Sequence, residues 1–198
     1  MKLKKSWIII GIILLLVFTA YRFFVSSYNG MVSRDETVTA QWSNVENVYQ
    51  RRADLIPNLV NTVKGYAAHE KETLEGVIEA RAKATGVSID PANLNEQTMQ
   101  QFQQAQAGLS AALSKLMVVV ERYPELKANQ NFLELQAQLE GTENRIAVER
   151  KKFNETVQAY NTFIRSFPNN TVAGMYGFER KASFKAEQGS EKAPEVKF

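Results

Sequence analysis

The chain has 198 residues, with 24 basic and 21 acidic side chains, one histidine and no cysteine. The lack of cysteine excludes disulfides, thiolate metal sites and cysteine nucleophiles. Four basic residues (Lys2, Lys4, Lys5 and Arg22) lie in or before an apolar N-terminal run, which leaves 20 basic against 21 acidic residues in the rest. That remainder is nearly neutral and has no basic cluster, so we expect no nucleic acid partner.

The apolar run extends from Trp7 to Val25 and is interrupted only by Arg22. Its length as a helix is roughly 28 Å, close to the ~30 Å hydrocarbon core of a bilayer. We therefore predict a single transmembrane helix from Trp7 to Val25, within a region 1–27 that also holds a cytoplasmic, basic N-terminus. A cleaved secretory signal is the alternative, with Val25-Ser26-Ser27 as a weak cleavage site; the length of the run favours the uncleaved anchor.

The lysines ahead of the run predict the orientation, because positive flanking residues stay on the cytoplasmic side. We expect a single-pass protein of the inner (cytoplasmic) membrane with a cytoplasmic N-terminus and an exported body. A body that remains cytoplasmic is the alternative if this charge bias is misleading.

Beyond the anchor, apolar residues recur with alternating spacings of four and three, a period near 3.5 that is typical of long packed helices. The first such pattern runs from Val38 and ends near Thr85-Gly86, with a capping box at 33–36 and a kink expected at Pro57. Asn29-Gly30 is either a hinge or part of one helix continuous with the anchor. This first helix would exceed its partners in length, so part of it must project as a stalk or fold back at Pro57.

The second pattern runs from Met99 to Tyr123 after an Asp90-Pro91 cap, and the third from about Asn129 to Phe167, with a short helix over 171–182. No strand-like alternation occurs. The predicted fold class is all-α: an N-terminal transmembrane helix followed by an elongated antiparallel helical bundle over residues 28–185. Residues 186–198 are polar and charged, and we expect a disordered tail there.

Several strings resemble one known family, the LemA family. They include Arg52-Ala-Asp-Leu-Ile-Pro-Asn-Leu-Val60, Glu121-Arg-Tyr-Pro-Glu-Leu-Lys-Ala-Asn129 and Glu143-Asn-Arg-Ile-Ala147. The resemblance covers about residues 28–184 and implies a bacterial, membrane-anchored antiparallel helical bundle. Family members occur near membrane-protease and membrane-stress components, which implies an envelope role but no reaction and no active site.

We predict no catalytic residue, no cofactor and no metal. His69 is the only histidine, and its neighbour Glu70 points to a different helix face. A carboxylate-bridged metal pair in a bundle needs Glu-x-x-His sequences on two helices, and the chain has none.

Polar residues that interrupt the apolar patterns form the candidate network, because such groups are costly in a helix interface unless they are paired. We favour a structural role, in which Arg52, Glu70, Glu143 and Arg150 fix helix register through buried pairs. The alternative is a ligand site with Arg52 and Arg150 binding an anion. The exposed turns 129–132 and 167–170 are candidate partner-docking loops. The network comprises Arg52, Asp54, Asn58, Glu70, Arg81, Glu121, Glu143, Asn144, Arg150, Asn154 and Asn161.

These observations predict a non-enzymatic, membrane-anchored helical-bundle protein that scaffolds or binds proteins of the cell envelope, with a homo-oligomer as one option. Its expected partners are the membrane and envelope proteins. The alternative is a regulatory subunit, or a ligand or anion sensor, of a membrane protease or envelope-stress system that uses the polar network.

Overall fold

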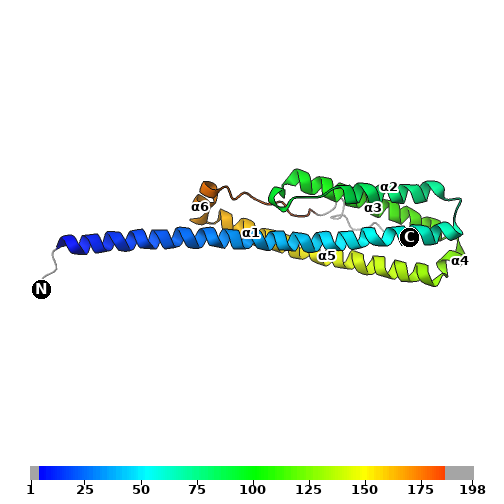
Figure 1. Ribbon diagram of the computed structural model, residues 1–198, viewed down its shortest axis with the longest axis horizontal. Coiled ribbons are helices and arrows are strands. Elements are labelled where there is room, and N and C mark those ends of the chain that lie inside the picture. Colours follow the sequence, from blue (N-terminus) through cyan, green and yellow to red (C-terminus); the bar gives the residue numbers. More distant parts are fainter. Residues whose placement is uncertain (1–4, 186–198) are drawn as a thin grey trace, which may run out of the picture.

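The computed structural model describes residues 5–185, which form helices joined by short connections (Figure 1). Within that range there is no strand, and the predicted all-α bundle is confirmed. Lys2, Lys4 and the predicted tail 186–198 lie outside the described residues. The elements are α1 (Lys5–Tyr66), α2 (Lys71–Gly86), the 3₁₀ helix η1 (Pro91–Asn93), α3 (Glu96–Val120), α4 (Pro124–Lys127), α5 (Gln130–Arg165) and α6 (Asn169–Tyr176).

Helix α1 is continuous over 62 residues, or roughly 93 Å at the helical rise, and it carries both the apolar run and the first helix of the body (Figure 1). It contains one 18-residue window apolar enough to cross a membrane, and this window is not buried in the body. Asn29-Gly30 is therefore no hinge. The expected capping box at 33–36 was wrong, because a helix that continues through these residues has no free N–H groups to cap there.

The fold-back occurs at Ala67–Glu70 and not at Pro57. A proline inside a helix removes the hydrogen bond to the carbonyl four residues earlier, here that of Ala53. In the structure Arg81 of α2 donates from Nε to this carbonyl at 2.7 Å. Because Arg81 supplies the missing donor from outside the helix, α1 continues past Pro57 for another nine residues.

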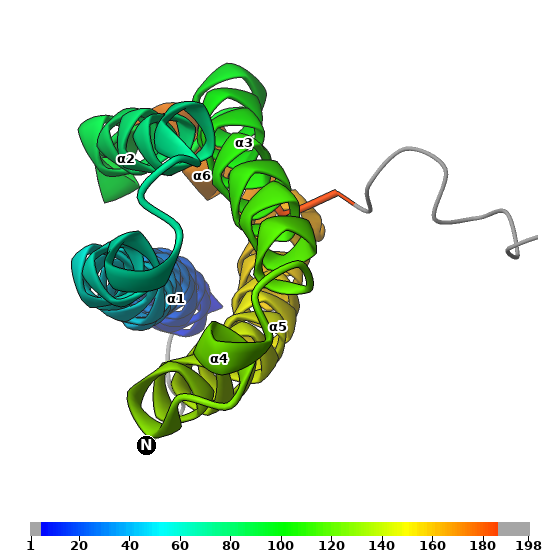
Figure 2. The same cartoon turned by 90° about the vertical axis from the view of Figure 1, so that its right-hand side faces the viewer.

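Helix α1 packs against α5 and α2, and α2 packs against α3, in an antiparallel arrangement seen end-on in Figure 2. The apolar core is divided into two clusters. The cluster nearer the N-terminal run centres on Trp42, whose ring lies 5.2 Å from that of Phe102 and 5.3 Å from that of Phe153. The second cluster begins at Ile56 of α1. Arg52 lies on the same helix between the two clusters.

Caps and turns follow the sequence with local differences. Asn95, and not Asp90, caps α3, because Asp90-Pro91 opens the short η1 instead. Asn129, near which the third pattern was expected to begin, caps α5, with Oδ1 accepting from the N–H of Phe132 at 3.0 Å. The predicted helix over 171–182 is shorter than expected: α6 ends at Tyr176 because Gly177 adopts φ 74°, which favours glycine.

Residues 178–185, here called the C-terminal segment, run back along α5 without regular structure (Figure 1). The segment inserts Phe184, 5% exposed, beside Trp42 at a ring distance of 6.1 Å. The end of the described chain is therefore part of the core.

Arg81 donates the hydrogen bond that Pro57 cannot donate, and this predicts energetic coupling between α1 and α2. Arg81→Met should lower the free energy of unfolding by about 1–2 kcal/mol, because it leaves the Ala53 carbonyl without its donor. In a Pro57→Ala background, the substituted residue supplies its own N–H, so the same change should cost about 0.5 kcal/mol or less. Urea unfolding of the four full-length proteins in detergent measures the cycle. If Arg81→Met costs the same free energy in both backgrounds, Arg81 does not compensate for the missing N–H of Pro57.

Candidate functional site

A polar groove of about 830 Å³ lies between α3 and α5. Tyr49 and Arg52 of α1 and residues of the C-terminal segment also line it. Because both signs of charge and several amides face it, the groove is suited to a polar ligand or peptide and not to an apolar one. Its other polar lining residues are Glu96, Gln100, Gln103, Gln104, Gln106, Ser110, Glu143, Arg150, Asn161, Arg180, Lys181, Ser183 and Lys185.

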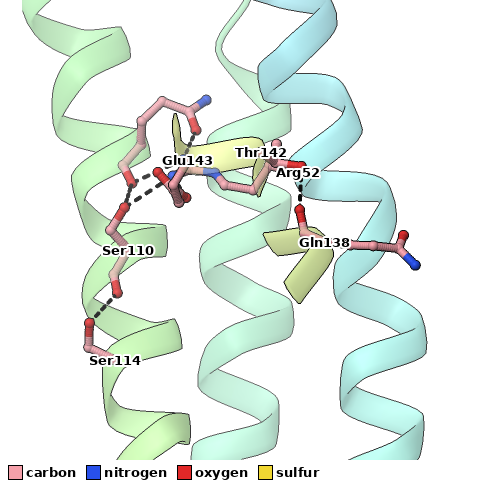
Figure 3. Close-up of polar contacts among 7 residues, drawn as sticks. Arg52, Ser110, Ser114, Gln138, Thr142 and Glu143 are labelled. Carbon is pink, nitrogen blue, oxygen red and sulfur yellow. Dashed lines mark hydrogen bonds and ion pairs between the residues drawn. The ribbon is translucent and has the colours of Figure 1, made fainter. Parts of the chain in front are cut away.

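Arg52 is the most buried charge of the described chain, with 2% of its surface exposed (Figure 3). Its Nη1 donates to Glu143 of α5 at 2.7 Å and to Ser110 of α3 at 3.1 Å. Its Nη2 donates to Gln106 Oε1 at 2.5 Å. Gln106 in turn donates to the carbonyl of Ala84 on α2 at 3.2 Å. One polar layer therefore joins α1, α2, α3 and α5.

One member of the polar layer, Glu143, is exposed to solvent. Glu143 is 48% exposed in its side chain, so its carboxylate is shared between Arg52 and the groove. The ring of Tyr49 lies under the Arg52 guanidinium, 5.1 Å from centroid to Cζ. Burial raises the pKa of Tyr49, although Arg150 and Arg52 nearby act in the opposite direction. Tyr49 thus remains a neutral phenol at physiological pH.

Glu70 belongs to a different site, at the far end of the bundle. It accepts a hydrogen bond from Tyr123 Oη at 3.0 Å and pairs with Arg122 at 3.1 Å. The hydrogen bond to the Glu70 carboxylate raises the pKa of Tyr123. Glu121 nearby is exposed and pairs with Lys127 at 2.5 Å.

Two asparagines of α5 hold the C-terminal segment. Asn161 accepts from the N–H of Lys181 at 3.0 Å and donates to its carbonyl at 2.8 Å. Asn154 makes the same pair of bonds to Phe184, at 2.9 Å and 3.1 Å. Seven residues apart on one helix face, the two amides mimic a strand partner for an otherwise unpaired backbone. Arg150 also contacts the segment, because its guanidinium Cζ lies 4.7 Å from the centroid of the Phe184 ring.

A second anchor of this segment is Lys181. Its Nζ pairs with Asp35 of α1 at 2.7 Å and donates to the carbonyl of Pro91 at 3.0 Å. Beneath it, burial raises the pKa of Tyr160 to about 12, with Asp35 and Glu179 adding to the effect. Lys181 and the asparagines thus fix the position of the C-terminal segment, which lines the groove.

The remaining network members lie apart from these sites. Asp54 is exposed and accepts from Gln50 of its own helix at 2.8 Å. Asn58 and Asn144 are exposed, as is His69 in the turn after α1. Within residues 5–185 no group of three His, Asp or Glu side chains is arranged to hold a metal ion.

The sequence reasoning brought Arg52 and Glu143 into one network but missed Gln106, Ser110 and the basic residues of the C-terminal segment. Gln106 occupies an apolar position of its helix pattern, which was the signal available in the sequence, and it is buried in the structure. Arg180, Lys181 and Lys185 gave no signal, because their position depends on how the segment folds back.

Comparison with known proteins gives a consistent assignment. The sequence model of the LemA family matches residues 41–198. Magnetosome protein MamQ 2 of Paramagnetospirillum magneticum is 30% identical over 174 residues, which cover 79% of this chain and 64% of that protein. MamQ of Magnetospirillum gryphiswaldense is 29% identical over the same shares. Protein LemA of Metamycoplasma hominis is 22% identical over 168 residues, 85% of this chain and 73% of that protein. The chain thus spans less than two thirds of the length of its MamQ relatives.

The buried arginine layer predicts a stability cost that a paired substitution relieves. Arg52→Met should lower the free energy of unfolding by about 3 kcal/mol, because the buried Oε1 of Gln106 is left without its donor. Adding Gln106→Leu should recover much of this loss by making the layer apolar. Arg145→Met, an exposed change on α5, is the control and should cost less than about 0.5 kcal/mol. Chemical unfolding of the full-length variants measures these values; a cost at Arg52 equal to that at Arg145 would contradict the layer's role.

The asparagine bonds predict local control of the C-terminal segment. Asn161→Ala should speed amide hydrogen exchange at Lys181 by about tenfold, because the acceptor of that N–H is lost. Exchange at Phe184 should change less, since Asn154 still holds it. Asn144→Ala, an exposed asparagine of the same helix, should leave both amides unchanged. Hydrogen-exchange mass spectrometry of the intact protein measures these rates. An unaltered rate at Lys181 in Asn161→Ala would show that Asn161 does not hold the C-terminal segment.

Proposed function

The chain belongs to the LemA family, and from this premise we propose that it is a non-enzymatic, membrane-anchored scaffold that holds a polar groove at a fixed height for proteins of the cell envelope. The apolar N-terminal part of α1 is the anchor in this proposal. The body is the scaffold, and the groove between α3 and α5 is its binding surface.

The continuity of α1 is the observation that carries the proposal. No linker separates the apolar run from the body, because one helix spans Lys5–Tyr66. From Val25 to the end of α1 the helix extends roughly 60 Å. A helix that is packed along most of this length cannot pivot freely, so a partner bound to the body is kept at a set distance and angle from the bilayer.

The proposed orientation places the N-terminus in the cytoplasm and the bundle outside the inner membrane, following the positive-inside rule. A reporter that is active only outside the cytoplasm, fused after Phe198, should be active. Activity of a cytoplasm-only reporter at the same point would reverse the orientation without affecting the scaffold proposal.

A non-enzymatic role agrees with the groove and with the names of the relatives. The groove brings together Arg52, several amides and the carboxylates of Glu96 and Glu143, and His69, the single histidine of the chain, is not among its lining residues. The MamQ relatives are named for the magnetosome and not for a reaction.

The second candidate function is an anion sensor or regulatory subunit of a membrane protease or envelope-stress system. It is favoured by Arg150, Arg180 and Lys185, which all line the groove. An acidic peptide bound there would meet these side chains and the glutamines of α3. In this case the ligand, and not a permanent partner, would occupy the groove.

Site-specific photo-cross-linking in living cells tests the scaffold. A photoreactive amino acid at Gln100 or Gln104, both exposed in the groove, should give defined protein adducts, identified by mass spectrometry. The same probe at Ile78, 51% exposed on α2, is the control and should give few or none. Adducts to another copy of the chain would indicate self-assembly. Absence of any adduct from the groove positions, at normal expression, would refute the scaffold.

A thermal shift with a tetraglutamate peptide tests the sensor. The full-length protein in detergent should melt at higher temperature with the peptide, and Arg150→Gln should reduce this shift. Arg145→Gln, outside the groove, should not. A shift that is equal in both variants, or absent in the wild type, would reject an acidic peptide as the ligand.

A further inference from the structure

Large apolar side chains are exposed at the end of the body that faces the N-terminal run. Phe167 in the turn between α5 and α6 is 85% exposed, and Met175 and Tyr176 of α6 are 67% and 58% exposed. Tyr28 of α1, 39% exposed, contacts Tyr176 with a ring distance of 4.9 Å. We call these four residues the collar. So much exposed apolar surface at one end of a molecule indicates a surface that is covered in the cell.

The collar lies at the level where the apolar run ends. Asn169, the first residue of α6, accepts a hydrogen bond from Ser27, two residues beyond Val25. Phe163 of α5 lies against Gly30, where an added Cβ would be 2.8 Å from its ring. In Figure 1, α6 caps the end of the bundle from which the free part of α1 emerges.

The core of the body even overlaps the apolar run. Phe23, inside the predicted span Trp7–Val25, is partly buried and packs against the same cluster as Trp42. Val172 and Ala173 of α6, 0% and 4% exposed, belong to this cluster. No stalk of α1 therefore separates the body from the span.

These positions locate the collar relative to a bilayer. Ser27 is only about 3 Å beyond Val25 along the helix axis. The headgroup layer on each side of a bilayer is roughly 5–7 Å thick. If α1 spans the membrane, α6 and the preceding turn must lie within that layer. Tyrosine is enriched at this depth, and an apolar ring such as that of Phe167 gains by leaving water there.

We propose that the collar is a second membrane-contact site, in which Phe167, Met175 and Tyr176 insert into the interfacial layer of the bilayer beside α1. This inference rests on the proposed anchor. It gives the body two points of attachment, one through the helix and one through the turn and α6. Two contacts fix the tilt and rotation of the bundle, which a single helix alone does not.

The lack of cysteine allows a direct test with single reporters in the full-length chain. Phe167→Cys and Met175→Cys, each labelled with an environment-sensitive fluorophore, are reconstituted into vesicles of phosphatidylcholine and phosphatidylglycerol. Lipids carrying a nitroxide near the headgroup should quench both labels at least about twofold. Leu133→Cys, an exposed position of α5 near the opposite end, is the matched control and should not be quenched.

Leu14→Cys separates the two proposals, because a nitroxide deep in the acyl chains should quench this label if α1 spans the bilayer. Quenching at 14 together with no more quenching at 167 and 175 than at 133 would overturn the second contact and leave the anchor intact. No quenching at 14 would refute the anchor itself. Labels at 167 and 175 that are shielded from an aqueous quencher, yet insensitive to the lipid nitroxide, would place protein on the collar and also overturn the inference.

Discussion

The unbroken course of α1 is the constraint on which the rest of the molecule depends. Helix α1 is continuous over 62 residues, and a carbonyl buried along it is costly unless it finds a hydrogen-bond donor. Pro57 removes one donor, and Arg81 replaces it from α2. This hydrogen bond satisfies the carbonyl in α1 and also holds α2 against α1. The continuity of α1 and the packing of α2 therefore depend on the same contact.

Along this helix Arg52 lies between the two apolar clusters, after Tyr49 of the first and before Ile56 of the second. A fully apolar interface of four helices would tolerate shifts of one heptad, because apolar contacts are not directional. Such a shift would break the hydrogen bonds that Arg52 donates to Glu143, Ser110 and Gln106 on two other helices. The burial of a charge costs stability, and the register that it fixes is the compensating gain. The groove is open above this layer, which leaves Glu143 in contact with water.

The C-terminal segment lines the groove and adds Phe178, Ala182 and Phe184 to the apolar cluster around Trp42. Asn154 and Asn161 provide it with backbone hydrogen bonds, and Phe184 provides it with apolar contacts. A continuous helix, a register-fixing polar layer and a polar groove on the body are consistent with the proposed role of positioning a partner.

The sequence by itself determined the features that depend on neighbours along the chain. Helical periodicity and the apolar run predicted the all-α bundle and the candidate span, and Tyr123-Pro124 and Asn129 marked helix ends, because propensity, capping and length are local properties. Only the tertiary structure decided where the first helix turns back, since Pro57 is tolerated through a contact with Arg81, 24 positions away in the chain. The partners of the polar residues were decided in the same way. Asn161 meets Lys181, Glu70 meets Arg122, and Arg52 meets Glu143, and such pairings follow from the path of the chain in space and not from spacing in the sequence.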